Sequence, residues 1–148
     1  MKIRIELDET LGETEIVIKT AQLDQQIHQI QKALEEITTP SILFYKDTSE
    51  YFVELDTILF FETDGNKVFA HVCEDAYEVK MKLYELEEIL PRNFCRISKS
   101  TITNTKRIYS LNKSFSGTSS IHFSDTYKQI HVSRHYYKLL KERLNEMR

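Results

Sequence analysis

The sequence predicts an α+β protein that is mostly antiparallel β-strand, in which a β-hairpin and an amphipathic helix precede a β-rich domain. Two patterns support this prediction. After residue 40, short runs rich in β-branched and aromatic residues alternate with turn residues. Before residue 40, the spacing of apolar residues changes from every second residue to every third or fourth. The length of 148 residues fits one domain with an extension.

The chain begins with two alternating segments. Residues 3–7 and 16–18 place apolar side chains at every second position, with charged residues between many of them, which is the pattern of half-buried strands. A turn near Leu11 and Gly12 is expected to join the two segments. The result would be a hairpin with one apolar face.

An amphipathic helix is expected over residues 20–37. Thr20 can cap its start through a side-chain oxygen, and Pro40 prevents it from continuing. We place the boundary between an extension, residues 1–40, and the main domain, residues 41–148, at this proline. The apolar stripe of the helix must pack against the chain's own β domain or against another subunit. Its residues are spaced by four and three in turn: Leu23, Ile27, Ile30, Leu34 and Ile37.

The main domain is expected to consist of short antiparallel strands interrupted by two helices. Gly65 and Asn66 tolerate positive φ and mark one of the turns. One helix begins near Leu83 and stops at Pro91, and Ser133 can cap the other. The expected strands are residues 41–45, 51–53, 57–62, 67–73, 77–81, 94–97, 102–104, 107–111, 120–123 and 129–132.

The charge of the chain is strongly segregated. Residues 1–90 carry 8 Lys and Arg against 20 Asp and Glu, a net charge of −12, whereas residues 91–148 carry 12 against 3, or +9. A basic region on an acidic chain is typical of a protein that binds a polyanion, because neutralised phosphates release counterions. A basic surface that merely complements the acidic half fits the same numbers, so composition leaves both interpretations open.

Other functional classes find little support. No apolar run approaches the roughly 20 residues of a membrane span and no signal peptide is evident, which favours a cytoplasmic protein. Cys73 and Cys95 form no ligand pattern with the histidines, so we expect neither a disulfide nor a metal site. Nucleotide-binding, metalloprotease and nucleophile motifs are missing. We therefore expect no enzyme activity, no cofactor and no small-molecule substrate.

One stretch carries a specific pattern. Residues 90–108 read LPRNFCRISKSTITNTKRI, in which basic residues surround small hydroxyl residues that can approach phosphates. Together with TILFFETDGNKVFAHV upstream and QIHVSRHYYKLL downstream, this stretch resembles the LytTR family of bacterial DNA-binding domains over residues 42–145. The shared blocks are a strand with a Phe-Glu pair and a polar turn, a helix ending in Leu-Pro, the pattern Phe-x-Arg-x-x-x-Ser-x-x-x-Asn, and Ser-Arg at the start of the last helix.

The resemblance implies an elongated antiparallel β fold that places loops, and not a recognition helix, against DNA. Arg134 offers a planar donor fork suited to guanine, and Lys99 can reach a base or a phosphate. Arg96 and Asn104 match motif positions too, and each could contact DNA or fix a loop. The implied DNA-contacting set is therefore Asn66 or Lys67 in the turn after FFE, Lys99, Arg134 and, in one of their two roles, Arg96 and Asn104.

The N-terminal part departs from the commonest family architecture. Many LytTR regulators carry a phosphoacceptor receiver domain there, whereas residues 1–40 are too few to form one. The chain instead resembles short stand-alone members, which implies three partners: double-stranded DNA, a second copy of the chain, and a small membrane protein that restrains the regulator. The favoured function is a sequence-specific transcriptional regulator that binds repeated half-sites as a pair. The alternative is a protein-interaction module that keeps a LytTR-like fold without binding DNA.

Overall fold

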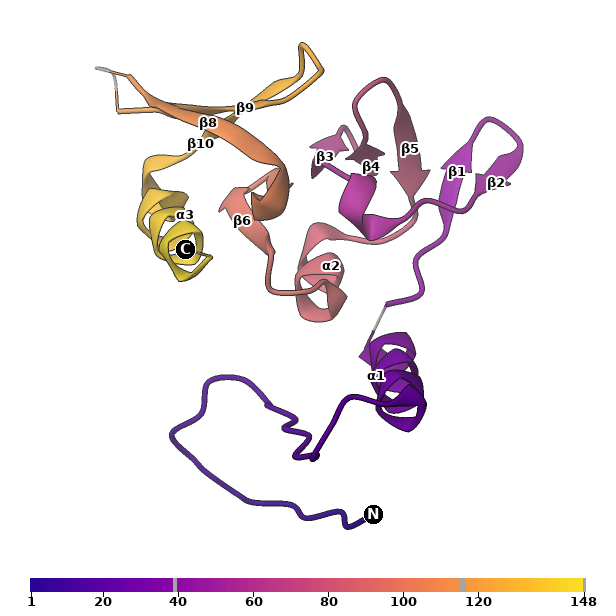
Figure 1. The fold of residues 1–148 in the computed structure, drawn as a ribbon. Coiled ribbons are helices and arrows are strands. Elements are labelled where there is room, and N and C mark those ends of the chain that lie inside the picture. The colour runs from indigo at the N-terminus through magenta and orange to yellow at the C-terminus, as the bar shows by residue number, and fades with distance from the viewer. Residues whose placement is uncertain (39, 115–116, 148) are drawn as a thin grey trace. The chain divides into compact units, whose positions relative to one another are not determined.

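The computed structural model of the chain describes residues 1–38, 40–114 and 117–147. The chain divides into two compact units, Met1–Thr38 and Thr39–Arg148 (Figure 1). Thr39, next to the predicted boundary at Pro40, lies outside the described residues. Within the described ranges, no helix is long and apolar enough to cross a membrane.

The first unit contains one helix, and the predicted hairpin is wrong. No strand forms in residues 1–24, all of which the structure describes. The apolar side chains that would line the hairpin are exposed, with Ile3 85% and Leu7 94% accessible to solvent. A two-stranded hairpin with no further element packed on it is marginal in water. Alternation of apolar and polar residues is therefore not enough to produce strands here.

Helix α1 (Gln25–Thr38) begins later than residue 20. Asp24 caps it, because its Oδ1 accepts a hydrogen bond from the Ile27 amide at 3.0 Å. Thr20 instead donates its hydroxyl to the Gln22 carbonyl at 3.0 Å. The amides of a first helical turn lack backbone partners, so an aspartate immediately before them fixes the start of the helix.

The apolar stripe of α1 is only partly covered. Ile27, Ile30 and Leu34 are half-buried. Leu23 and Ile37, at the two ends of the stripe, are 76% and 78% exposed. Burying one large apolar side chain stabilises a protein by about 1.5–3 kcal/mol. The stripe is therefore a surface on which another protein element could gain substantial free energy.

The larger sheet of the second unit is antiparallel and seven-stranded, with the order β2-β1-β5-β4-β3-β7-β6. Strand β3 pairs with β4 on one side and with β7 on the other. Helix α2 (Leu83–Ile89) connects β5 to β6 and contacts β3, β6 and β7. The strands are β1 (Phe44–Lys46), β2 (Ser49–Tyr51), β3 (Phe60–Asp64), β4 (Lys67–His71), β5 (Ala76–Val79), β6 (Phe94–Ser98) and β7 (Thr101–Asn104).

A smaller sheet has the order β10-β9-β8 and is formed by β8 (Ile108–Lys113), β9 (Ser119–Phe123) and β10 (Gln129–Val132). Helix α3 (Arg134–Glu146) follows β10 and contacts β6. The prediction of antiparallel strands with two helices after residue 40 is confirmed, although several strands are shifted by a few residues. For example, β3 starts only at Phe60, because Leu55–Thr57 forms a turn of 3-10 helix; a second such turn spans Thr105–Arg107.

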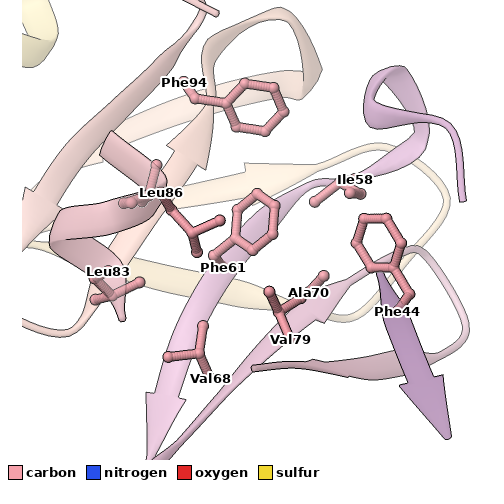
Figure 2. Close-up of a cluster of buried hydrophobic side chains, with 10 residues drawn as sticks. Phe44, Ile58, Phe61, Val68, Ala70, Val79, Leu83, Leu86 and Phe94 are labelled. Atoms are coloured by element: carbon pink, nitrogen blue, oxygen red, sulfur yellow. The ribbon is translucent and has the colours of Figure 1, made fainter. Parts of the chain in front are cut away.

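Two apolar cores meet at β3. On one face, Phe61 packs in a cluster with Leu86 of α2 (Figure 2). The neighbouring Phe60 belongs to the other cluster, which includes Ile121 of the smaller sheet and Leu140 of α3. Successive strand residues point to opposite faces, so the Phe60–Phe61 pair serves both cores. This strand therefore joins the core beneath α2 to the core shared with the smaller sheet and α3.

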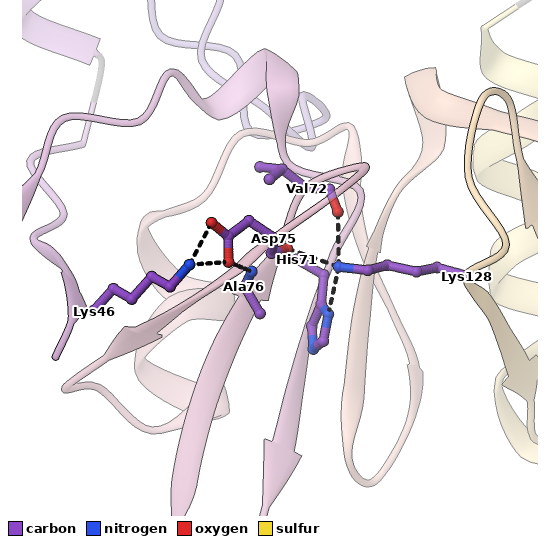
Figure 3. A network of polar contacts seen from close by, with 6 residues as sticks. All are labelled: Lys46, His71, Val72, Asp75, Ala76 and Lys128. Atoms are coloured by element: carbon purple, nitrogen blue, oxygen red, sulfur yellow. Dashed lines mark hydrogen bonds and ion pairs between the residues drawn. The ribbon is translucent and has the colours of Figure 1, made fainter.

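A polar contact ties the smaller sheet to the larger one. The Nζ of Lys128, in the segment between β9 and β10, donates to the carbonyls of Val72 at 2.8 Å and Asp75 at 2.7 Å in the β4–β5 loop (Figure 3). The same Nζ lies 3.2 Å from His71 Nδ1. The Asp75 carboxylate in turn pairs with Lys46 Nζ at 2.6 Å. One lysine thus anchors a turn of the smaller sheet on a loop of the larger.

Candidate nucleic-acid interface

Three chain segments that carry predicted site residues come together in the second unit. They are the β3–β4 turn with Asn66 and the adjoining Lys67, the β6–β7 turn with Lys99, and the first residue of α3, Arg134. All four side chains belong to exposed residues. We term the surface formed by these four residues the contact edge.

Backbone hydrogen bonds link the three segments of the contact edge. The Thr63 amide, near the end of β3, donates to the Ser100 carbonyl in the β6–β7 turn at 2.9 Å. The Ser133 amide, immediately before α3, donates to the Ile97 carbonyl of β6 at 2.9 Å. These bonds join main-chain groups, so they do not depend on side-chain rotamers. The fold itself therefore sets the relative positions of the three segments.

The β3–β4 turn presents an amide and an ammonium group. Gly65 adopts a φ of +63°, which a glycine reaches without steric strain. The Lys67 Nζ lies 3.6 Å from Glu78 Oε1, and the lysine side chain is 57% exposed. An exposed ion pair contributes about 0–1 kcal/mol, so Lys67 can exchange this partner for a hydrogen-bond acceptor on a ligand. The Asn66 amide can both donate and accept hydrogen bonds.

Acidic residues flank this turn. Glu62 lies half-buried on β3, and the exposed Asp64 ends the strand. Burial, assisted by the negative charge of Asp64, raises the pKa of Glu62. At neutral pH these carboxylates oppose the approach of a phosphate to the turn.

Arg96 fixes the β6–β7 turn. Its side chain is only 16% exposed, and its Nε donates to the Ser98 carbonyl at 2.6 Å. The guanidinium also donates to the Lys99 carbonyl and to the Glu87 carboxylate of α2. With these three partners, the Arg96 guanidinium holds the turn that presents Lys99. Of the two roles that the sequence left open for Arg96, this geometry favours the positioning role.

Asn104 is fully buried, with 0% of its surface exposed. Its Nδ2 donates to the Ile58 carbonyl at 2.9 Å. Its Oδ1 accepts hydrogen bonds from the Lys106 amide at 3.1 Å and from Asn93 Nδ2 at 2.8 Å. These bonds fix the segment after β7 from inside the protein. Because no part of Asn104 reaches the surface, we leave it out of the contact edge.

Arg134 is the first residue of α3 and follows the N-cap, Ser133. The helix begins at the predicted residue, but the Ser133 side chain makes no capping hydrogen bond. Its Oγ is buried and has no partner among the residues that the structure describes. The Tyr136 amide instead donates to the Ser133 carbonyl at 3.1 Å. The Arg134 guanidinium lies against Gly117 of the β8–β9 loop.

The sequence identifies Arg96 as a residue that could support the contact edge, but it does not reveal two others. Gly117 lies against Arg134, and Lys128 ties the two sheets together, yet each acts on a partner far along the chain. No local spacing signals such a contact.

Over the described ranges there is also no group of three or more side chains that could hold a metal ion.

The chain is similar to known proteins over nearly its whole length. Two relatives, both described as uncharacterized HTH-type transcriptional regulators of Staphylococcus aureus, come from strains NCTC 8325 / PS 47 and COL. Each is 27% identical over 146 residues, which cover 98% of this chain and 99% of the relative. The relatives therefore match the N-terminal unit as well as the β domain.

A solved LytTr DNA-binding domain from Bacillus cereus shares the fold. It superposes with a TM-score of 0.65 and 22% sequence identity, covering 71% of this chain and 97% of the solved chain. This confirms the predicted LytTR-like β architecture. The model of the LytTr DNA-binding domain family also matches residues 49–145. That match covers well over half of the 148 residues, and the chain therefore belongs to the family of LytTr DNA-binding domains.

Proposed function

We propose that this protein is a transcriptional regulator that binds specific sites on double-stranded DNA through its contact edge, in the cytoplasm. The observation that carries the proposal is that three segments joined by backbone hydrogen bonds each present exposed polar or cationic side chains. The printed names of the Staphylococcus aureus relatives support a role in transcription. The helices α1, α2 and α3 are separated by strands in the described residues, which supports DNA contact through two turns and the start of α3.

Each side chain of the contact edge has a chemical role that fits DNA. The Arg134 guanidinium can donate two parallel hydrogen bonds to guanine O6 and N7. The Lys99 ammonium can reach a base acceptor or a phosphate, and the Asn66 amide matches the donor and acceptor of adenine. Arg96 supports the contact edge by holding the β6–β7 turn, which presents Lys99.

The regulator acts as a pair in this proposal. A single contact edge offers few side chains and reads a short half-site, so useful affinity requires two copies on one face of the duplex, about one or two helical turns of roughly 10 bp apart. The first unit is suited to assembly and not to DNA. Residues 1–40 carry 4 Lys and Arg against 8 Asp and Glu, a balance that repels phosphate.

Substitution of the contact edge tests the proposal. Arg134→Ala and Lys99→Ala should each weaken binding to a footprinted site by about 5- to 150-fold, which corresponds to the roughly 1–3 kcal/mol of a good base contact. Lys141→Ala, which removes a positive charge from an exposed position later in α3, is the matched control and should change affinity much less. Fluorescence anisotropy measures the affinity, and circular dichroism checks the fold.

A salt titration separates DNA binding from the alternative, a protein-interaction module. Binding to phosphates makes the logarithm of affinity fall with the logarithm of salt concentration, with a slope of about −0.9 per neutralised phosphate. If Lys99 contacts a phosphate, Lys99→Ala should flatten the slope by about one, whereas Arg134→Ala should mainly reduce discrimination between sites. Wild-type affinity in both variants would rule out the contact edge as the DNA-binding surface.

A further inference from the structure

Gly117 of the β8–β9 loop lies against the first residue of α3. Gly117 adopts a φ of +87°, and its amide donates to the Ser114 carbonyl at 3.3 Å. The Ser114 amide donates to the Thr118 carbonyl at 3.2 Å, which closes the loop. These bonds give Gly117 a defined place opposite the start of α3.

The Arg134 guanidinium fills the space that a side chain at position 117 would need. A methyl group built on Gly117 would lie 2.7 Å from Arg134 Cζ and closer still to Nε. Carbon atoms that are not bonded need about 3.5–4.0 Å. Gly117 therefore contacts the guanidinium directly, and any other residue at this position must displace it.

Contact with the Gly117 backbone restricts the Arg134 side chain. A free arginine side chain samples many rotamers, and ordering them upon binding opposes association. A side chain that already lies against a neighbouring loop avoids part of this loss, which is the general advantage of preorganisation. The loop opposite α3 can thus raise the affinity of a contact that it does not make itself.

We propose that Gly117 is a positioning residue that holds the Arg134 guanidinium in the orientation in which it contacts DNA. This inference rests on the proposed function of the contact edge. The guanidinium is the far end of a flexible side chain, so a methyl group at position 117 moves the guanidinium and leaves the backbone of α3 in place. The expected result is a protein that is folded but binds its site poorly.

A double-mutant cycle on the full-length chain tests the proposal. Affinity for the footprinted site is measured for the wild type, Gly117→Ala, Arg134→Ala and the double variant. Gly117→Ala should weaken binding several-fold in the wild-type background and by less than about twofold in the Arg134→Ala background, since the residue that it positions is then absent. Equal weakening in both backgrounds would overturn the proposal, as would unchanged affinity of Gly117→Ala.

A matched glycine controls for backbone strain. Gly65 also has a positive φ, +63°, but a methyl group there would meet nothing within 4 Å. Thermal unfolding of Gly65→Ala therefore reports the strain of alanine at positive φ without displacement of a neighbour, a loss of roughly 4–8 °C in Tm. Gly117→Ala should show a similar loss, and a much larger one would mean that the loop, and not Arg134, carries the effect.

A measurement without DNA distinguishes this proposal from the proposed function. The heteronuclear NOE of the Arg134 Nε–H group reports whether the guanidinium is ordered in the free protein. It should be high in the wild type and low in Gly117→Ala. Equal values would overturn the positioning role, whatever Arg134→Ala does to DNA affinity. If the NOE is high in the wild type and low in Gly117→Ala, but Arg134→Ala does not change DNA affinity, the DNA contact of Arg134 would be overturned instead.

Discussion

Replacing Lys128 by methionine tests whether one ammonium group holds the two sheets together. Methionine keeps an unbranched stem of similar length and removes the charged donor. The change leaves the Val72 and Asp75 carbonyls, which now accept hydrogen bonds at 2.8 and 2.7 Å, without this partner. His71 Nδ1, at 3.2 Å, loses the same neighbour.

The magnitude follows from these contacts. Both carbonyls belong to half-buried residues, and the Asp75 carbonyl keeps a hydrogen bond from the Val72 amide at 3.0 Å, so neither becomes a fully buried acceptor without a partner. A hydrogen bond to a charged group contributes about 1.5–3 kcal/mol. Burial lowers the pKa of Lys128, so desolvation of the ammonium opposes part of this gain. We expect Lys128→Met to lower the free energy of unfolding by about 2–4 kcal/mol, or roughly 10 °C in Tm for a domain of this size.

Urea unfolding followed by circular dichroism measures the effect, with Lys141→Met as a control at an exposed position of α3. The contact between the β9–β10 turn and the β4–β5 loop should also loosen, although the Thr126 hydroxyl still donates to the Cys73 carbonyl at 2.8 Å. Hydrogen exchange at the Val72 amide, which donates to the Asp75 carbonyl, would detect this. Stability within 0.5 kcal/mol of the wild type, the range typical of surface substitutions, would refute the view that this contact fixes the two sheets.

Three further outcomes are expected. Burial and the charge of Lys128 lower the pKa of His71 from 6.5 to about 4, so the unfolded state binds more protons between these values and stability falls as pH drops from 6.5 to 4. After allowance for solvent screening the loss is about 1–2 kcal/mol, and His71→Asn, which keeps an acceptor, should reduce it in urea titrations at each pH. Replacing both Ile30 and Leu34 by Glu should lower the mass by light scattering or the Tm; no change in either would mean that the α1 stripe has no partner. Inserting 5 bp between two half-sites should abolish joint occupancy in a footprint, whereas indifference to the insertion would exclude binding as a pair.

The strands of the β domain could be predicted because the signals for them, β-propensity and alternation, lie within short stretches of the sequence. The Phe60–Phe61 pair of β3 sends one ring into each core, and both the β-propensity and the alternation of the run are visible in the sequence. The hairpin at residues 3–18 had the same alternation but formed no strand. Strand formation needs a surface to cover, and no local pattern tells whether that surface exists.

The four residues of the contact edge were all named from the sequence, but the residues that support it could be predicted only in part. Lys99 and Arg134 were identified from motif positions, and the structure exposes both. The motif positions Arg96 and Asn104 could not be assigned in this way, since a motif does not tell whether a polar side chain faces solvent or the protein. Asn104 is buried, and two of its hydrogen-bond partners, Ile58 and Asn93, lie well before it in the chain. The contact of Gly117 with Arg134 had no sequence signal at all, because it depends on how a loop meets a helix.

The net charge of −3 does not oppose DNA binding, because only nearby charges matter. At about 0.1 M salt the screening length is roughly 10 Å, so charges farther than this from a phosphate interact with it only weakly. The three segments of the contact edge differ in the charges close to them. Glu62 and Asp64 flank the β3–β4 turn and repel phosphate there, whereas Lys99 and Arg134 stand in the basic part of the chain. We expect the β6–β7 turn and the start of α3 to supply the electrostatic attraction and the β3–β4 turn to contribute contacts with base edges.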